Sequence, residues 1–79
     1  MVTVHRALGF RFTIYKNDHE PAHIHVVGNG GEAKVQLSGP GGLALIWTVG
    51  ISHPDLRRIM REVEVELTRL VLKWQEIHG

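Results

Sequence analysis

The sequence predicts an α+β domain, in which a small, mostly antiparallel sheet of four strands is covered on one face by one long C-terminal helix. Apolar and polar residues alternate in short runs within the first fifty residues, and glycine-rich turns separate these runs. The remaining residues carry apolar side chains at steps of three and four, the period of a helix. Short turns favour antiparallel neighbours, and a chain of 79 residues is expected to form a single domain, residues 1–79.

The first two expected strands cover about residues 9–16 and 23–28. A strand with one buried face alternates apolar and polar side chains, and both segments do so. In the first, the apolar side is Phe10, Phe12 and Ile14, and the polar side is Arg11, Thr13 and Tyr15. In the second, His23 and His25 share one face, opposite Ile24 and Val26.

Two further strands are expected at about residues 32–38 and 43–49. The segment "GNGG", residues 28–31, contains residues that tolerate the positive φ of a tight hairpin turn. The segment "SGPGG" ends the third strand with a second turn. The fourth run does not alternate cleanly, which indicates a strand covered on both faces or one that leaves the sheet.

The helix is expected over about residues 53–78, with Ser52 as N-cap and Asp55 three residues later. Its apolar stripe comprises Leu56, Met60, Val63, Leu67, Leu70, Trp74 and Ile77. A helix of this length is about 37 Å long, whereas a six-residue strand reaches about 20 Å. Part of the helix therefore needs another cover. Val65 and Leu72 lie outside the stripe, and they indicate either ordinary exposed residues or a seam for a homo-oligomer or protein partner.

Composition excludes several classes of function. The formal charge is +1 and charges of both signs are mixed, so no basic tail indicates nucleic acid. There is no cysteine, which excludes disulfides and thiolate metal ligands. No apolar run approaches the roughly 20 residues of a membrane span, and no signal peptide is recognisable. We therefore expect a cytoplasmic protein that does not enter a membrane.

The segment "NDHEPAHIHV", residues 17–26, is the main candidate for a site. If Tyr15 faces His23 across the first hairpin, Thr13 faces His25 and Arg11 faces Val27, with opposed side chains about 5 Å apart. This places a polar cluster on the sheet face away from the helix.

Three interpretations of this cluster stay open. His23 and His25, with His19 or Asp18 as a third ligand, could hold zinc or another divalent transition metal. Alternatively, two imidazoles could act as acid and base on an RNA phosphodiester, with Arg11 stabilising the phosphate and Tyr15 nearby. In the third interpretation Asp18 and Pro21 form a turn, and the histidines are strand residues without a chemical role.

The motif Asp18-His19-x-Pro21-x-His23-x-His25 resembles the signature of a small bacterial family catalogued as domain of unknown function four-one-six-zero. The likeness extends from the Gly9-led strand to a C-terminal helix ending near Trp74. Ala22 departs from it, because the family usually has a second proline there. The resemblance implies a small cytoplasmic protein that is the toxin of a toxin–antitoxin pair, with Asp18, His19, His23 and His25 as the functional residues.

These observations lead to two hypotheses for function. The first is a toxin, of ribonuclease type, that acts on RNA through Arg11, Tyr15, His19, His23 and His25 together with Asp18, and whose small antitoxin packs on the helix. The alternative is a histidine-rich module that binds a metal such as zinc, or a partner protein, without catalysis of its own.

Overall fold

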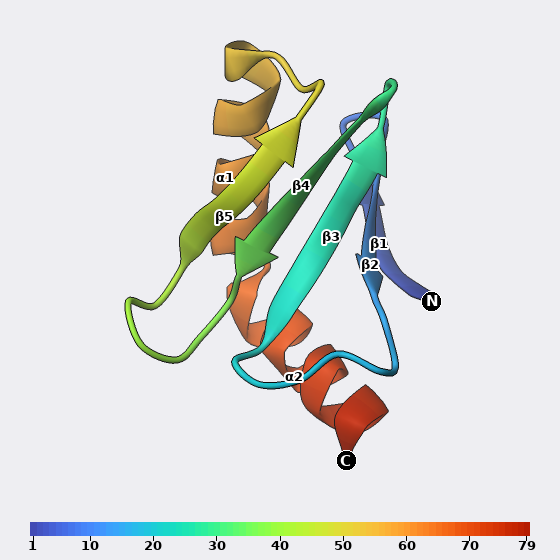
Figure 1. Cartoon of the computed structure of the whole chain (residues 1–79), viewed down its shortest axis with the longest axis vertical. Coiled ribbons are helices and arrows are strands. Elements are labelled where there is room, and N and C mark those ends of the chain that lie inside the picture. The colour runs from blue at the N-terminus through green and yellow to red at the C-terminus, as the bar shows by residue number, and fades with distance from the viewer.

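A computed structural model describes all 79 residues as a five-stranded antiparallel sheet with helices on one of its faces (Figure 1). The strands follow one another in the sheet in the order of the sequence. The elements are β1 (Val2–Ala7), β2 (Phe10–Ile14), β3 (His23–Gly28), β4 (Gly31–Gln36), β5 (Ala44–Val49), α1 (His53–Val65) and α2 (Leu67–His78). The prediction of four strands and one long helix is therefore wrong in the number of strands and in the number of helices.

The strand that the sequence analysis missed is β1, which pairs with β2 at one edge of the sheet. Thr3 lies opposite Thr13, but the next pair is His5 with Phe12, so the register shifts at Val4. This bulge changes the parity of the side chains within the strand, and His5 turns towards the helices. A two-residue period that is interrupted in the middle of six residues gives no clear pattern in the sequence.

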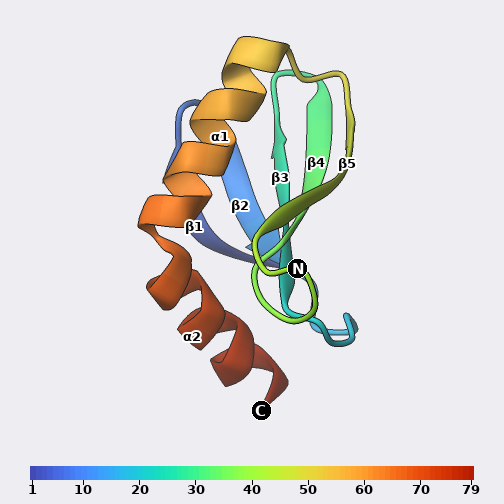
Figure 2. The ribbon, with the colours of Figure 1, turned by 90° about the vertical axis from the view of Figure 1, so that its left-hand side faces the viewer.

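The expected single helix is divided at Glu66, whose φ of −95° and ψ of 10° depart from helical values. Figure 2 shows α1 lying against the sheet and α2 continuing at an angle beyond the ends of the strands. Arg69 holds the junction: its guanidinium donates to Glu66 Oε1 at 2.8 Å and to the carbonyl oxygen of Val4 at 3.1 Å. The helices thus follow the sheet for part of their length and then leave it.

The start of α1 follows the prediction, because the Ser52 hydroxyl accepts a hydrogen bond from the Asp55 amide at 3.3 Å. At the other end of the chain, α2 packs on the segment between β2 and β3. The His78 ring contacts the carbonyl oxygen of Tyr15 at 3.1 Å, and Trp74 is buried. This segment contains Asp18 and His19 of the candidate site, so α2 packs against the part of the site that lies outside the strands. Neither helix is long and apolar enough to cross a membrane.

The core lies between the sheet and the helices. Its fully or nearly fully buried members from the strands and turns are Phe10, Phe12, Ile14, Ala22, Ile24, Val26, Ala33, Val35 and Leu37, and those from the helices are Ile59, Val63, Leu70 and Trp74. Strand residues between these positions point to the opposite side of the sheet. We call that opposite side the histidine face; its strand residues include Arg6, Arg11, Thr13, His23, His25, Val27, Glu32, Lys34, Trp47 and Val49.

Candidate metal centre

The pairing of β2 with β3 places the two strand histidines on the histidine face. Thr13 lies opposite His25 and Arg11 lies opposite Val27, as the register derived from the sequence predicts. The Thr13 hydroxyl donates a hydrogen bond of 3.1 Å to the carbonyl oxygen of His25. The two histidines are buried, although they lie on the sheet face away from the helices: His23 is only 7% exposed and His25 only 9%.

His23 is held in one tautomer by its own chain. Its Nδ1 lies 2.9 Å from the carbonyl oxygen of Pro21. A carbonyl oxygen can only accept, so Nδ1 must carry the hydrogen, and in a neutral ring Nε2 is then left with a free lone pair. The turn before β3 therefore fixes both the orientation of this imidazole and the nitrogen that is available to a ligand.

His25 is held in the same way by a neighbouring strand. Its Nδ1 lies 3.0 Å from Glu32 Oε2, at a position diagonal to it on β4. An ionised carboxylate also only accepts hydrogen bonds, so Nδ1 again carries the hydrogen and Nε2 has the lone pair. Both imidazoles consequently present the same nitrogen to the space between them.

Asp18 supplies the third group. Its Oδ2 lies 3.0 Å from His23 Nε2 and 3.9 Å from His25 Nε2. This oxygen is buried and receives no hydrogen bond, despite the short distance to His23. In a neutral His23 whose Nδ1 carries the hydrogen, Nε2 has none to donate to this oxygen. Three ligand atoms, one from each of these residues, thus lie within 4.8 Å of one another.

The position of Asp18 depends on a tight turn after β2. The Asp18 amide donates a 3.1 Å hydrogen bond to the carbonyl oxygen of Tyr15, the same oxygen that His78 of α2 contacts. The ring of Tyr15 lies 4.5 Å from that of His25, measured between centroids. On the other side of His25 is Trp47 of β5, at a centroid distance of 6.1 Å. Aromatic rings therefore flank His25 on both sides.

One side of the three-residue cluster opens into a pocket of about 360 Å³. The pocket is lined by Asn17, Asp18, His19, Glu20, Pro21, His23, Lys34, Gln36 and Ile46. Lys34 is a lining cation that takes part in no ion pair. The cluster is accordingly buried on the protein side and accessible from one direction.

The residues expected to form the site divide into two groups. Asp18, His23 and His25 converge, with Tyr15 in contact with His25. His19 is exposed and lines the same pocket, but it is not among the three whose ligand atoms meet. Arg11 lies farther along β2 and borders a different pocket.

The sequence analysis missed two residues next to the cluster, Glu32 and Trp47. Both belong to strands that follow the histidine motif in the chain. Glu32 could have been found from the hairpin, because the glycine turn sets it opposite Val27 and so diagonal to His25. Trp47 gives no such signal, since its place depends on a register shift in the pairing of β4 with β5.

The sequence model of a protein family described as "Domain of unknown function (DUF4160)" matches residues 9–75, which is most of the chain. The match covers the whole histidine motif and leaves out all of β1. No curated protein and no solved structure is similar enough to the chain to count as a match.

Proposed function

The chain belongs to the family described as Domain of unknown function (DUF4160), and from the geometry of its histidine face we propose that Asp18, His23 and His25 bind one divalent transition-metal ion. The observation that carries the proposal is the convergence of three possible ligand atoms, Nε2 of each histidine and Oδ2 of Asp18, within 4.8 Å of one another, with the Asp18 oxygen buried and without a hydrogen-bond partner.

Bringing these three groups together without a cation between them costs free energy. Buried acceptors that lack a donor lose their hydration without gaining a partner, at about 1–3 kcal/mol for each group and more for a charged one. A metal ion would satisfy all three lone pairs at once. A proton shared between Asp18 and one imidazole is the competing solution, and the experiment below separates the two.

The ligand set indicates which metals fit. Two imidazole nitrogens and one carboxylate oxygen suit zinc and the neighbouring late divalent ions. The support of both rings through Nδ1, by a backbone carbonyl and by a carboxylate, is the arrangement that orients histidine ligands in metal sites. Three protein ligands are fewer than a closed structural zinc site uses, so a position facing the pocket would remain for water or a substrate.

The test is calorimetric titration of zinc into metal-free, tag-free protein, with His23→Ala and Asp18→Asn as the altered forms. His53→Ala, which removes an exposed imidazole at the start of α1, is the matched control. We expect one zinc ion per chain for the wild type and the control, and at least tenfold weaker binding for both altered forms. Equal binding by all four proteins would show that only surface histidines bind zinc, and would contradict the proposal.

As a second candidate we propose that the protein is the toxin of a toxin–antitoxin pair and acts on RNA at this centre. The observation in its favour is the combination of an accessible ligand position with Lys34, a cation suited to a phosphate, in the same pocket. The growth experiment for this proposal is given in the Discussion.

A further inference from the structure

Two arginines lie directly opposite each other at the edge of the histidine face. Arg6 of β1 pairs with Arg11 of β2. Like charges in opposed positions of a sheet are destabilising, and an acidic neighbour usually compensates for them. Neither Arg6 nor Arg11 has such an acidic partner. The arginine and lysine ion pairs of the molecule involve only Arg58, Arg69 and Lys73 of the helices. The carboxylates on the histidine face form no ion pair with either arginine, because Asp18 and Glu32 lie against the two strand histidines.

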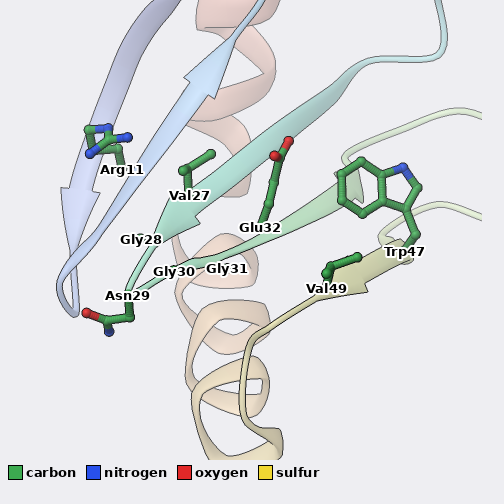
Figure 3. A pocket seen from close by; sticks show the side chains of 9 residues that line it. All are labelled: Arg11, Val27, Gly28, Asn29, Gly30, Gly31, Glu32, Trp47 and Val49. Atoms are coloured by element: carbon green, nitrogen blue, oxygen red, sulfur yellow. The ribbon is translucent and has the colours of Figure 1, made fainter.

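Arg11 also forms one side of a broad trough of about 670 Å³. Figure 3 shows Arg11 at one side of this trough and Trp47 at the other, with Val27, Glu32 and Val49 between them. The hairpin turn from Gly28 to Gly31 closes one end. Trp47 is 40% exposed although it is the largest type of apolar side chain. The trough therefore combines a guanidinium without an ion pair, two valines on either side of Glu32, and an exposed indole.

We propose that this trough binds single-stranded nucleic acid, with a base stacked on Trp47 and phosphates bound by Arg11 and Arg6. The inference goes beyond the metal centre and does not depend on it, since none of the three ligand residues lines the trough. The two sites are nevertheless neighbours, because Glu32 lines the trough and holds His25. A bound strand would thus pass beside the metal centre.

The combination of groups favours a single strand over other anions. A duplex keeps its base faces stacked inside, so it could use the arginines but not the indole. An acidic peptide would likewise satisfy the arginines and leave Trp47 without a flat partner. Single-stranded nucleic acid supplies both a repeating negative charge and exposed aromatic rings, and proteins that bind it combine cations with aromatic platforms in this way.

The experiment measures binding of the full-length protein, in EDTA, to fluorescently labelled single-stranded RNA and DNA of about ten nucleotides. EDTA removes any metal, so failure of the metal proposal cannot be mistaken for failure of this one. The altered forms are Trp47→Ala, Trp47→Phe and Arg11→Gln, and the control is Arg57→Gln, an exposed and unpaired arginine on α1. Circular dichroism establishes that each form is folded.

We expect Trp47→Ala to weaken binding about 5- to 150-fold, the range measured for loss of one stacked base, and Trp47→Phe to recover most of it. Arg11→Gln should lower the slope of log affinity against log salt by about 0.7, as loss of one phosphate contact does, and Arg57→Gln should leave the slope unchanged. Binding of the wild type should quench the fluorescence of Trp47 and not that of Trp74, which is buried.

Four outcomes would overturn the proposal. One is equal affinity of Trp47→Ala and the wild type for the oligonucleotides. Another is equal competition by polyglutamate, which would identify a site for acidic peptides. The third is equal affinity for duplex and single strand, which would identify a site for any polyanion. Equal affinity for a mononucleotide and for the oligonucleotide would show that the site holds a single nucleotide, and would exclude a bound strand.

Discussion

Glu32 Oε2 lies 3.0 Å from Nδ1 of His25, and this contact decides which nitrogen of the ring faces Asp18. The two residues are on adjacent strands, joined by a hairpin whose turn includes Asn29 and Gly30, both with positive φ. The geometry of the turn thus determines the chemistry of the cluster, because a different register would move the carboxylate away from the imidazole.

The first prediction concerns this contact. Replacing Glu32 with Gln retains an acceptor but removes the charge that makes His25 a better ligand, so zinc affinity should fall about 10- to 100-fold. Competition with a chromophoric chelator measures the change. Glu64→Gln, on the exposed side of α1, is the matched control and should bind zinc like the wild type. Unchanged affinity in Glu32→Gln would mean that the carboxylate does not support the ligand.

The second prediction compares two leucines of α2. Leu70 is fully buried between the helices and the sheet, whereas Leu72 is 54% exposed. Leu70→Ala should lower the free energy of unfolding by about 2–5 kcal/mol, because it leaves a cavity as well as removing apolar contacts. Leu72→Ala should change it by less than about 0.5 kcal/mol. Urea denaturation followed by circular dichroism measures both values, and similar losses for the two variants would contradict the packing of α2.

The third prediction concerns pH and the helix junction. The hydrogen bond from Arg69 is the main cause that lowers the pKa of Glu66 from its ordinary value of 4.5. The charged carboxylate is therefore favoured by folding, and its contribution to stability is present above pH 4.5 and is lost as the pH falls through the lowered pKa.

The test of this sign compares urea denaturation midpoints of the wild type and Glu66→Gln. The wild type should have the higher midpoint at about pH 7, and the difference should shrink as the pH is lowered below 4.5. Glu64→Gln again serves as the control, and no such difference is expected for it. A difference that persists in acid would mean that the contact of Glu66 with Arg69 does not depend on charge.

The fourth prediction tests the toxin proposal. Expression of the protein alone in bacteria should slow growth, and His23→Ala should relieve the effect because it removes a ligand and one of the two strand imidazoles. His53→Ala should remain as inhibitory as the wild type. Equal amounts of soluble protein have to be verified for each form. Normal growth with the wild type would exclude the toxin role, while leaving the zinc titration unaffected.

The strands that carry the site were the most predictable part of the fold. In β2 and β3 the period of two is uninterrupted, so the division into a core face and a histidine face followed from the residues alone. The glycine turn then fixed the pairing of β3 with β4. The partners Thr13–His25 and Arg11–Val27 were correct for this reason, since register in a hairpin depends on local chemistry.

The errors arose where distant contacts decide the structure. The bulge in β1 allows His5 to reach Glu62 at 2.6 Å, a contact across 57 positions of the chain that leaves no local pattern. The helix is interrupted at Glu66 without a proline or glycine, and the contacts of Arg69 to β1 hold the junction. Periodicity describes the faces of an element, but it does not show where a neighbouring element bends it.

The tautomers of the two histidines could not be predicted from the sequence either. The motif gave residue types and spacing, which leave a metal, a proton and a plain turn all open. Only the positions of the Pro21 carbonyl and of Glu32 show that both rings donate through Nδ1. Those positions result from a turn and from a strand pairing, and neither can be derived from the spacing of histidines.

Core and site residues alternate along β3: His23 and His25 belong to the site, and Ile24 and Val26 belong to the core. A single residue inserted or deleted within this strand would carry the imidazoles into the apolar interior and the aliphatic side chains out to the pocket. Relatives of this protein should therefore keep the length of β3 constant and carry insertions or deletions in the turns between strands rather than within it.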